Sequence, residues 1–338
     1  YNLAARDILR GRPENIDLVY DRLFGTPDAG GSLKSFTDAL VAQMRLSADK
    51  FEKVKDFTNA NKLRGNAKVY EGAMAQFELY RPGVMVSDIT TPLLEGFREA
   101  RFLKGNTKST VGVYLRTLRA LYNKAVKIYG IDDKRPFEGV LKGLVSRKAP
   151  GRKKYALRDG VRLIEGLRHE VASMHRWTDL WLLQFYFGGA DLIDVYYLKN
   201  AQLRNGRVHF ERAKGNGGAF VDLPVHPKAQ SIIDKYRVEG EFVFPWRKDT
   251  DGYKTFRRQM GRALVKAQEK AGLELEGMGG NLGVKMARHT FSNIAKRMGI
   301  DGDLLRELMG HERRDVDNDY KDLFPRDMRD RALFRIIG

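Results

Sequence analysis

Residues 304–324 read LLRELMGHERRDVDNDYKDLF, a stretch that begins as a short apolar-periodic helix and stops at Gly310. Glycine just past the last helical residue is a common helix stop, because it adopts the left-handed conformation without steric cost. We therefore expect His311 to lie at a sharp turn. A charged segment then leads to Tyr320, nine residues after His311. Taken alone, the stretch predicts a helix end, a surface loop and a packed aromatic side chain.

Composition limits the class of protein before any motif is considered. A chain of 338 residues favours two domains over one core. Its 61 Lys and Arg against 43 Asp and Glu give a net charge of +18. Such an excess favours a polyanionic partner, with nucleic acid first and an anionic membrane surface second. No apolar run approaches the length of a bilayer span, and the absence of cysteine excludes disulfides and thiolate chemistry. We expect a soluble, intracellular and basic protein.

The first half of the chain has a helical pattern. The segments 32–57, 88–105 and 107–130 each place apolar residues near a period of 3.6, and Thr90 or Thr91 is a plausible N-cap. In the segment 107–130 the apolar stripe is Val111, Tyr114, Leu115, Leu118, Leu121, Tyr122 and Ala125. The rest of this helix is basic, with Lys108, Arg116, Arg119 and Lys124. These residues fit either a solvated face or a face that contacts DNA phosphates.

The second half predicts a mixed fold. Helical patterns cover 158–171, 176–189, 253–272, 285–299 and 301–310. Between them, the runs GRVHFERAK and AFVDLPV alternate apolar and polar residues on either side of a Gly-rich turn, which indicates a β-hairpin with Lys214 beside the turn. The predicted class is mainly α with a small antiparallel sheet.

The expected organisation has four parts. They are an N-terminal arm at 1–30, a helical domain at 31–145, a basic linker at 146–155 and a mixed helix-and-sheet domain at 156–338. The linker carries Arg152 and Lys153, which are able to lie along a phosphate backbone. The tail 324–338 has an amphipathic pattern, which fits packing either against its own domain or against another copy of the chain.

Several chemistries find no support in the sequence. It contains no phosphate-binding G-x-x-x-x-G-K-[ST] loop, no H-E-x-x-H metal motif and no G-x-S-x-G nucleophile elbow. Asp191 and Asp194 fit a metal-dependent nuclease less well than they fit capping and salt bridging at a helix start.

Three segments together resemble the catalytic domain of tyrosine recombinases, the phage-integrase family. In that family a lysine on a β-hairpin is followed by an Arg-His pair opening a helix, then by Leu-x-Gly-His and by a tyrosine about nine residues later. Here the matching residues are Lys214, Arg288-His289, the LMGH ending at His311, and Tyr320. The preceding helices also resemble the family's core-binding domain, so the resemblance covers roughly residues 33–325.

The resemblance implies a DNA clamp that cuts and rejoins DNA at specific sites. Tyr320 would attack the phosphodiester, Arg288 and His311 would stabilise the charge that develops on it, and Lys214 would act as general acid. Lys285, where the family usually has histidine, would donate a hydrogen bond to the phosphate. The resemblance implies no metal and no nucleotide cofactor. It also implies a double-stranded attachment or recombination site as partner, a DNA-dependent homo-oligomer (a tetrameric synapse), no membrane association, and a bacterial or phage-encoded protein near the nucleoid in the cytoplasm.

One family residue is missing. The first arginine of the family pattern would fall at Asp191 or, in the register of some mobile-element integrases, at Gly188. Three explanations are open: another arginine compensates, an arginine at Gly188 has been replaced, or the protein binds DNA without cleaving it well. The arginines nearest in sequence are Arg176, Arg204, Arg207 and Arg212. A metal-dependent nuclease and a relaxing activity of the type IB topoisomerase kind are further alternatives.

Overall fold

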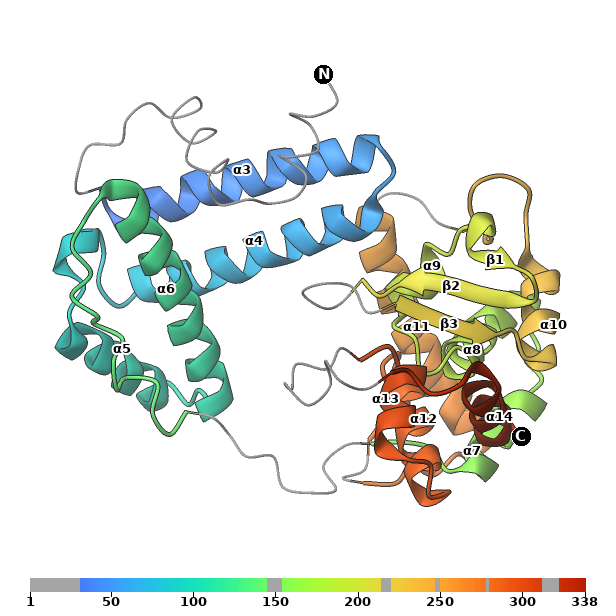
Figure 1. Cartoon of the computed structure of the whole chain (residues 1–338). Coiled ribbons are helices and arrows are strands. Elements are labelled where there is room, and N and C mark those ends of the chain that lie inside the picture. The colour runs from blue at the N-terminus through green and yellow to red at the C-terminus, as the bar shows by residue number, and fades with distance from the viewer. Residues whose placement is uncertain (1–30, 145–153, 214–219, 247–249, 278–279, 312–321) are drawn as a thin grey trace. The chain divides into compact units, whose positions relative to one another are not determined.

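The computed structural model describes residues 31–144, 154–213, 220–246, 250–277, 280–311 and 322–338. The chain divides into two compact units between residues 147 and 148, and the short segment 56–59 groups with the second unit. In the described part, the first unit is helical, and the second combines helices with a small sheet (Figure 1). Mainly α with a small antiparallel sheet is the predicted class, and it is confirmed.

The first unit is built from long helices. In chain order they are α3 (Leu33–Lys53), α4 (Phe57–Glu78), the 3-10 turn η1 (Val86–Asp88), α5 (Thr91–Leu103) and α6 (Lys108–Tyr129). Three of these helices begin at a hydroxyl N-cap, namely Ser32, Thr90 and Thr107, whose side chain accepts a hydrogen bond from the backbone N–H three residues on. Of the two candidate caps for α5, the structure selects Thr90.

Helix α6 supplies much of the core of the first unit. All but one of the residues in its predicted apolar stripe are buried, and Tyr114 is partly buried against the same core. The polar side of the helix leaves Lys108, Arg116 and Arg119 exposed, and Lys124 half-buried. Burial of the stripe therefore fixes which basic side chains this helix presents to solvent.

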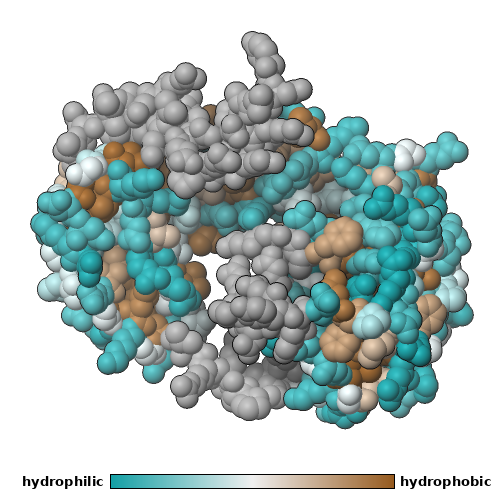
Figure 2. Space-filling view, viewed as in Figure 1, coloured by the Kyte–Doolittle hydropathy of each residue, from teal (hydrophilic) through white to brown (hydrophobic). Residues whose placement is uncertain are grey.

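The second unit contains the remaining elements. They are α7 (Arg158–Gly166), α8 (Ala172–Tyr186), α9 (Leu192–Tyr196), η2 (Asn200–Gln202), β1 (Leu203–Arg204), β2 (Arg207–Glu211), β3 (Phe220–Pro224), α10 (Pro227–Tyr236), α11 (Thr250–Ala271), α12 (Met286–Arg297), α13 (Gly302–Leu308) and α14 (Arg326–Ile337). Hydrophobic residues from these elements form one core around α8. On the face shown in Figure 2, the second unit is largely hydrophilic, with hydrophobic residues in small patches.

The predicted hairpin is present as β2 and β3, which pair antiparallel. Val208 lies opposite Leu223 and Phe210 opposite Val221, and all four side chains are buried. The period-two alternation therefore sets the register, because a shift by one residue would expose this apolar face. The short third strand β1 and helix α10 were not predicted, although Pro227 in the first turn of α10 is a typical helix-start signal.

The C-terminal helix α14 packs on its own unit. Ala332, Leu333, Ile336 and Ile337 are buried in the core of the second unit, whereas Phe334 stays 39% exposed. Arg158 holds the helix end by donating hydrogen bonds from Nη2 to the carbonyls of Arg335 and Ile336, at 2.6 and 2.9 Å. Of the two arrangements open for the tail, the structure shows packing in cis.

Candidate active site

The site is built where the first turn of α12 meets the end of α13. Arg288 lies in that first turn, and His311 directly follows Gly310. Gly310 has a φ of +57°, and the N–H of His311 donates to the carbonyl of Arg306 at 2.9 Å. This is the expected glycine-terminated helix end, so the predicted sharp turn at His311 is confirmed.

The Arg288 guanidinium is held by backbone carbonyls. Nη1 donates to the carbonyl of Gly189 at 2.8 Å, and Nη2 donates to that of Met309 at 2.9 Å. Burial, followed by the charge of Arg212, lowers the pKa of Arg288 to about 10, so the group remains charged at neutral pH. A guanidinium held in place by neutral acceptors keeps its full charge for an anion that arrives from outside.

His311 is bonded directly to this guanidinium. Its Nε2 lies 2.6 Å from Nη2 of Arg288. Because a guanidinium can only donate, Nε2 must be the acceptor, and the ring proton of the neutral imidazole is then on Nδ1. Loss of solvation, then the charges of Arg288, Arg212 and Arg306, lower the pKa of His311 to about 4. At neutral pH this histidine is an uncharged hydrogen-bond donor through Nδ1.

Asp191 and Asp194 both bind the end of strand β2. Asp191 accepts from Nη2 of Arg212 at 3.1 Å, and Asp194 accepts from the backbone N–H of Ala213 at 2.8 Å. The second carboxylate oxygen of Asp194 is buried without a hydrogen-bond partner among the described residues. Burial, as the largest cause, raises the pKa of Asp194 to about 6. These contacts are those of carboxylates that position a neighbouring strand.

The four arginines nearest to the missing family position lie in different surroundings. Arg176 stacks over the Trp177 ring at 4.3 Å, Arg204 is exposed at the end of β1, and Arg207 is paired with Asp222 and Asp330. Among these four, it is Arg212 that reaches the segment carrying His311: its Nη1 donates to the carbonyl of Gly310 at 2.8 Å.

The backbone at Gly188 excludes a side chain. Gly188 has a φ of +65°, and a Cβ built on it would lie 2.2 Å from the carbonyl oxygen of Leu308. Leu308 ends α13, two residues before Gly310, so the turn that presents His311 occupies the space that a residue at 188 would need. An arginine at this position would require the backbone of that turn to move.

The other predicted site residues are placed as follows. Lys285 is exposed and lies one helical turn before Arg288, at the N-cap of α12. Lys214, Tyr320, Arg152 and Lys153 lie outside the described residues. Lys108, Arg116, Arg119 and Lys124 belong to the first unit, on α6. The structure thus brings together Arg288 and His311, and adds Arg212 to them.

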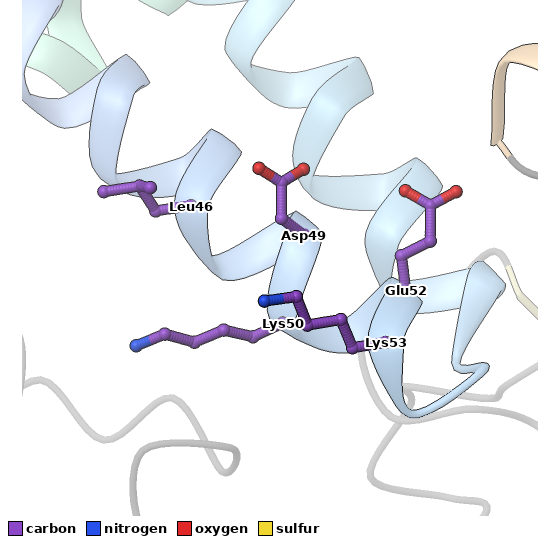
Figure 3. A pocket seen from close by; sticks show the side chains of 5 residues that line it. All are labelled: Leu46, Asp49, Lys50, Glu52 and Lys53. Carbon is purple, nitrogen blue, oxygen red and sulfur yellow. The ribbon is translucent and has the colours of Figure 1, made fainter.

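The first unit has a hollow beside helix α3. It is lined, among the described residues, by Leu46, Asp49, Lys50, Glu52 and Lys53, all on α3 (Figure 3). The carboxylates of Asp49 and Glu52 point toward α4, where Nη2 of Arg64 meets them at 2.5 and 2.6 Å. Their acidic groups therefore serve to join two helices.

Neither metal ligands nor membrane spans were found in the described part of the chain. No three His, Cys, Asp or Glu side chains there gather as a metal ion would need. None of its helices combines the length and the apolar character required to cross a bilayer.

Two protein-family models match the chain. The phage integrase SAM-like domain model matches residues 49–142, and the phage integrase family model matches residues 195–326. The tyrosine recombinase XerC of Thermodesulfovibrio yellowstonii is 25% identical over 232 residues, which is 65% of this chain and 73% of that protein.

Solved structures show the same fold. A lambda integrase tetramer bound to a Holliday junction matches with a TM-score of 0.53 and 16% identity, over 94% of this chain and 89% of that one. The XerH site-specific recombinase on its difH substrate matches with a TM-score of 0.54 and 18% identity, over 82% and 81%. The Tn1549 transposon integrase with circular intermediate DNA matches with a TM-score of 0.51 and 18% identity, over 85% and 97%.

The fold and the matched family models make this chain a site-specific DNA recombinase. More particularly, the chain belongs to the phage integrase family of tyrosine recombinases.

Proposed function

We propose that the protein cuts and rejoins DNA through a covalent 3′-phosphotyrosyl intermediate on Tyr320, without metal or ATP. The observation that carries this proposal is the contact between Arg288 and His311, a buried cation bonded to a neutral imidazole at 2.6 Å. Fixed donors of this kind stabilise the negative charge that develops on the non-bridging oxygens of a phosphate under attack.

The proposed step is an in-line displacement at phosphorus. The phenolic oxygen of Tyr320 forms a bond to phosphorus, the bond from phosphorus to the 5′-oxygen breaks, and the phenolic proton passes to water. Lys214 gives a proton to the leaving 5′-oxygen, which becomes a free hydroxyl. Lys285 contributes one more N–H donor to the phosphate.

Rejoining is the reverse reaction, with a 5′-hydroxyl as the nucleophile. The phosphotyrosyl ester retains the free energy of the broken phosphodiester, so no nucleotide is consumed. Because Arg288 supplies the positive charge that a divalent ion would otherwise provide, the proposed chemistry does not call for a metal.

We further propose that DNA assembles the protein into a synapse. Both units would contact one duplex. The first unit would do so through Lys108, Arg116, Arg119 and Lys124 of α6. The linker would add contacts from Arg152 and Lys153. The lambda integrase match is a tetramer on a Holliday junction, which supports a tetrameric synapse for this chain as well. The site of action would be an attachment or recombination site on the nucleoid of a bacterial or phage-infected cell.

The adduct assay tests the chemistry. A duplex carrying the attachment site of the encoding element, nicked next to the scissile phosphate, should trap a covalent protein–DNA adduct in EDTA. The adduct should disappear in Tyr320→Phe. An adduct that survives this change would remove Tyr320 as the nucleophile, and a requirement for Mg²⁺ would remove the metal-free mechanism.

Replacing Arg288 distinguishes a role in DNA cleavage from a role in DNA binding. Replacing one preorganised donor costs roughly 10²–10³-fold in rate, so Arg288→Ala should slow adduct formation by about this factor while duplex affinity changes little. Equal losses in both measurements would make Arg288 a phosphate clamp that serves binding alone.

One alternative function is supported by an observation. The absence of an arginine at Gly188 and Asp191 fits a protein that binds its site on the same scaffold without cleaving it. Such a protein would bind specifically and never form the adduct. Site-independent relaxation of supercoiled DNA would instead indicate the topoisomerase alternative, and EDTA-sensitive cleavage dependent on Asp191 and Asp194 would indicate the nuclease.

A further inference from the structure

We propose that Arg212 takes over the phosphate contact of the missing family arginine, with Asp191 as the residue that positions it. This inference rests on the proposed function, because it concerns the same scissile phosphate. The structure therefore offers a replacement guanidinium in the residue that follows strand β2, 21 residues along the chain from Asp191.

Arg212 and Arg288 are anchored on the same two segments. Arg288 bonds to the carbonyl of Gly189 in the first segment and to that of Met309 in the second. Arg212 bonds to Asp191, two residues after Gly189, and to the carbonyl of Gly310, directly after Met309. Consecutive Cα atoms are only ~3.8 Å apart, so the two guanidinium groups meet the same turn at adjacent positions, next to His311.

The burial and the hydrogen bonds of Arg212 are those expected of an arginine that binds the scissile phosphate. Its side chain is only 8% exposed, and Arg288 is likewise buried. A guanidinium has five N–H donors, and the bonds to Asp191 and Gly310 use two of those of Arg212. Its Nε is buried with no hydrogen-bond partner in the described part of the chain. Such unused buried donors are rare in proteins unless they serve a function.

The cluster has an excess of positive charge. Arg212 and Arg288 both lower the pKa of His311, and Arg212 lowers that of Arg288, so the groups sense one another's charge. Asp191 faces Arg212, while Asp194 has its pKa raised and binds the backbone N–H of Ala213. At His311 the charges of Arg288, Arg212 and Arg306 each outweigh that of Asp191, so an anion is favoured beside the ring.

The residues at the two possible positions of the family arginine, Gly188 and Asp191, explain why arginine is absent there. An arginine in either family register is excluded here, because Gly188 has no space for a Cβ, and position 191 holds the carboxylate that binds Arg212. A single pair, Asp191 and Arg212, therefore accounts both for the missing arginine and for the source of its substitute.

The test uses the nicked attachment-site duplex and four variants. Arg212→Ala should slow adduct formation roughly 10²–10³-fold, as expected for loss of one preorganised donor, with duplex affinity within a few fold of the parent. Arg212→Lys keeps the charge and should retain an intermediate rate. Arg204→Ala, an exposed neighbour, should cleave like the parent. Arg207→Ala removes the arginine at the start of β2, which is buried and paired with Asp222 and Asp330.

A second substrate separates charge stabilisation from structural support. A methylphosphonate at the scissile position replaces one charged oxygen by a methyl group, so the enzyme needs one cation less. The ratio of methylphosphonate to phosphate cleavage should rise at least tenfold in Arg212→Ala, rise less in Arg212→Lys, which keeps the charge, and stay at the parent value in Arg207→Ala. An unchanged ratio in Arg212→Lys and Arg212→Ala would overturn the proposal, as would parental cleavage of the phosphate by Arg212→Ala.

Failure of this inference is distinguishable from failure of the proposed function. If the parent protein forms no adduct on the phosphate duplex, the recombinase chemistry itself is wrong. If the parent forms the adduct and Arg212→Ala does so equally well, only the assignment of Arg212 is wrong. Asp191→Asn should reproduce the Arg212→Ala defect in weaker form, and a parental rate in Asp191→Asn would remove Asp191 as the positioning residue.

Discussion

Burial of His311, together with the charges of Arg288 and Arg212 beside it, determines how the site responds to acid. The folded protein holds His311 neutral, with its pKa lowered from 6.5 to about 4. Between these two values the unfolded chain binds a proton that the folded chain does not, so stability is lost as pH falls through this window. A phosphate placed beside the ring would favour the charged form and oppose this loss.

We therefore predict that His311→Gln reduces the acid sensitivity of the DNA-free protein. Between pH 6.5 and pH 4 its melting temperature should fall less than that of the parent, and above pH 7 the substitution should leave no pH-dependent difference. Thermal melts across this range are the measurement. A parent and variant with parallel curves would show that His311 already titrates normally in the folded protein.

Folding raises the pKa of Asp194 rather than lowering it, so the effect of this residue on stability runs in the opposite direction with pH. Its pKa rises from 3.8 to about 6 in the folded protein, so the unfolded chain releases its proton first and stability falls as pH rises from 3.8 to 6. Asp194→Asn removes this ionisation and should stabilise the protein above pH 6 by on the order of 3 kcal/mol. Chemical denaturation at pH 4 and pH 8 measures the difference. A gain of the same size at both pH values would contradict a titration effect.

The lack of space for a side chain at Gly188 leads to a prediction about stability. Gly188→Arg restores the family arginine in sequence, but its Cβ would meet the carbonyl of Leu308 at 2.2 Å. We expect a loss of about 3 kcal/mol or more in unfolding free energy and no gain in cleavage. Gly188→Ala carries the same Cβ without the charge and should show a comparable loss. Faster cleavage by a stable Gly188→Arg would contradict this account.

At the scale of elements, the end of α13 and the turn before α9 act together. One of these segments supplies the carbonyls of Met309 and Gly310, the other supplies Gly189 and Asp191, and the two arginines join them. A change in either segment should therefore affect both guanidinium groups. Helix α14 packs on β3, α12 and α13, so it supports the elements that carry the site.

Helix α14 offers a matched pair of substitutions. Leu333 is fully buried, and Phe334 is 39% exposed. Leu333→Ala should lower the unfolding free energy by about 2–5 kcal/mol, whereas Phe334→Ala should cost clearly less. Denaturation of the monomer without DNA measures both. Equal stability of Leu333→Ala and the parent would mean that this face packs on another chain in solution.

At the scale of the whole molecule, the net charge of +18 governs how the protein meets DNA. Contacts to phosphates release counterions, and each one adds about 0.9 to the slope of log affinity against log salt. The exposed Lys108 and Arg119 on α6 lie on one side of that helix, at positions eleven residues, or about three turns, apart.

The double variant Lys108→Ala with Arg119→Ala should lower this slope by about 1.8. Binding to the attachment-site duplex and to an unrelated duplex should weaken by similar factors, because phosphate contacts carry no sequence information. Titrations at several salt concentrations measure both. Weakening confined to the attachment site would assign these side chains to base contacts.

Much of this protein follows from local patterns in the sequence. The stripe of α6, the hairpin register, the Thr90 cap and the glycine stop at Gly310 all depend on neighbours within a few residues, and the structure has each of them. The order of Arg288, His311 and Tyr320 sufficed to identify the family. The structure leaves the roles of Lys214 and Tyr320 as predictions, since both lie outside the described residues.

What the sequence alone left open concerns residues that are far apart along the chain. Four arginines were equal candidates for the missing position, and nothing local distinguishes Arg212 from Arg207 at the start of β2. Folding pairs Arg207 with Asp330, 123 residues away, and brings Arg212 to Gly310, 98 residues away. The sequence by itself determined the elements and the family, because period and spacing are local properties. Only the tertiary structure decided which arginine reaches the site, because that depends on how a hairpin and two turns pack together.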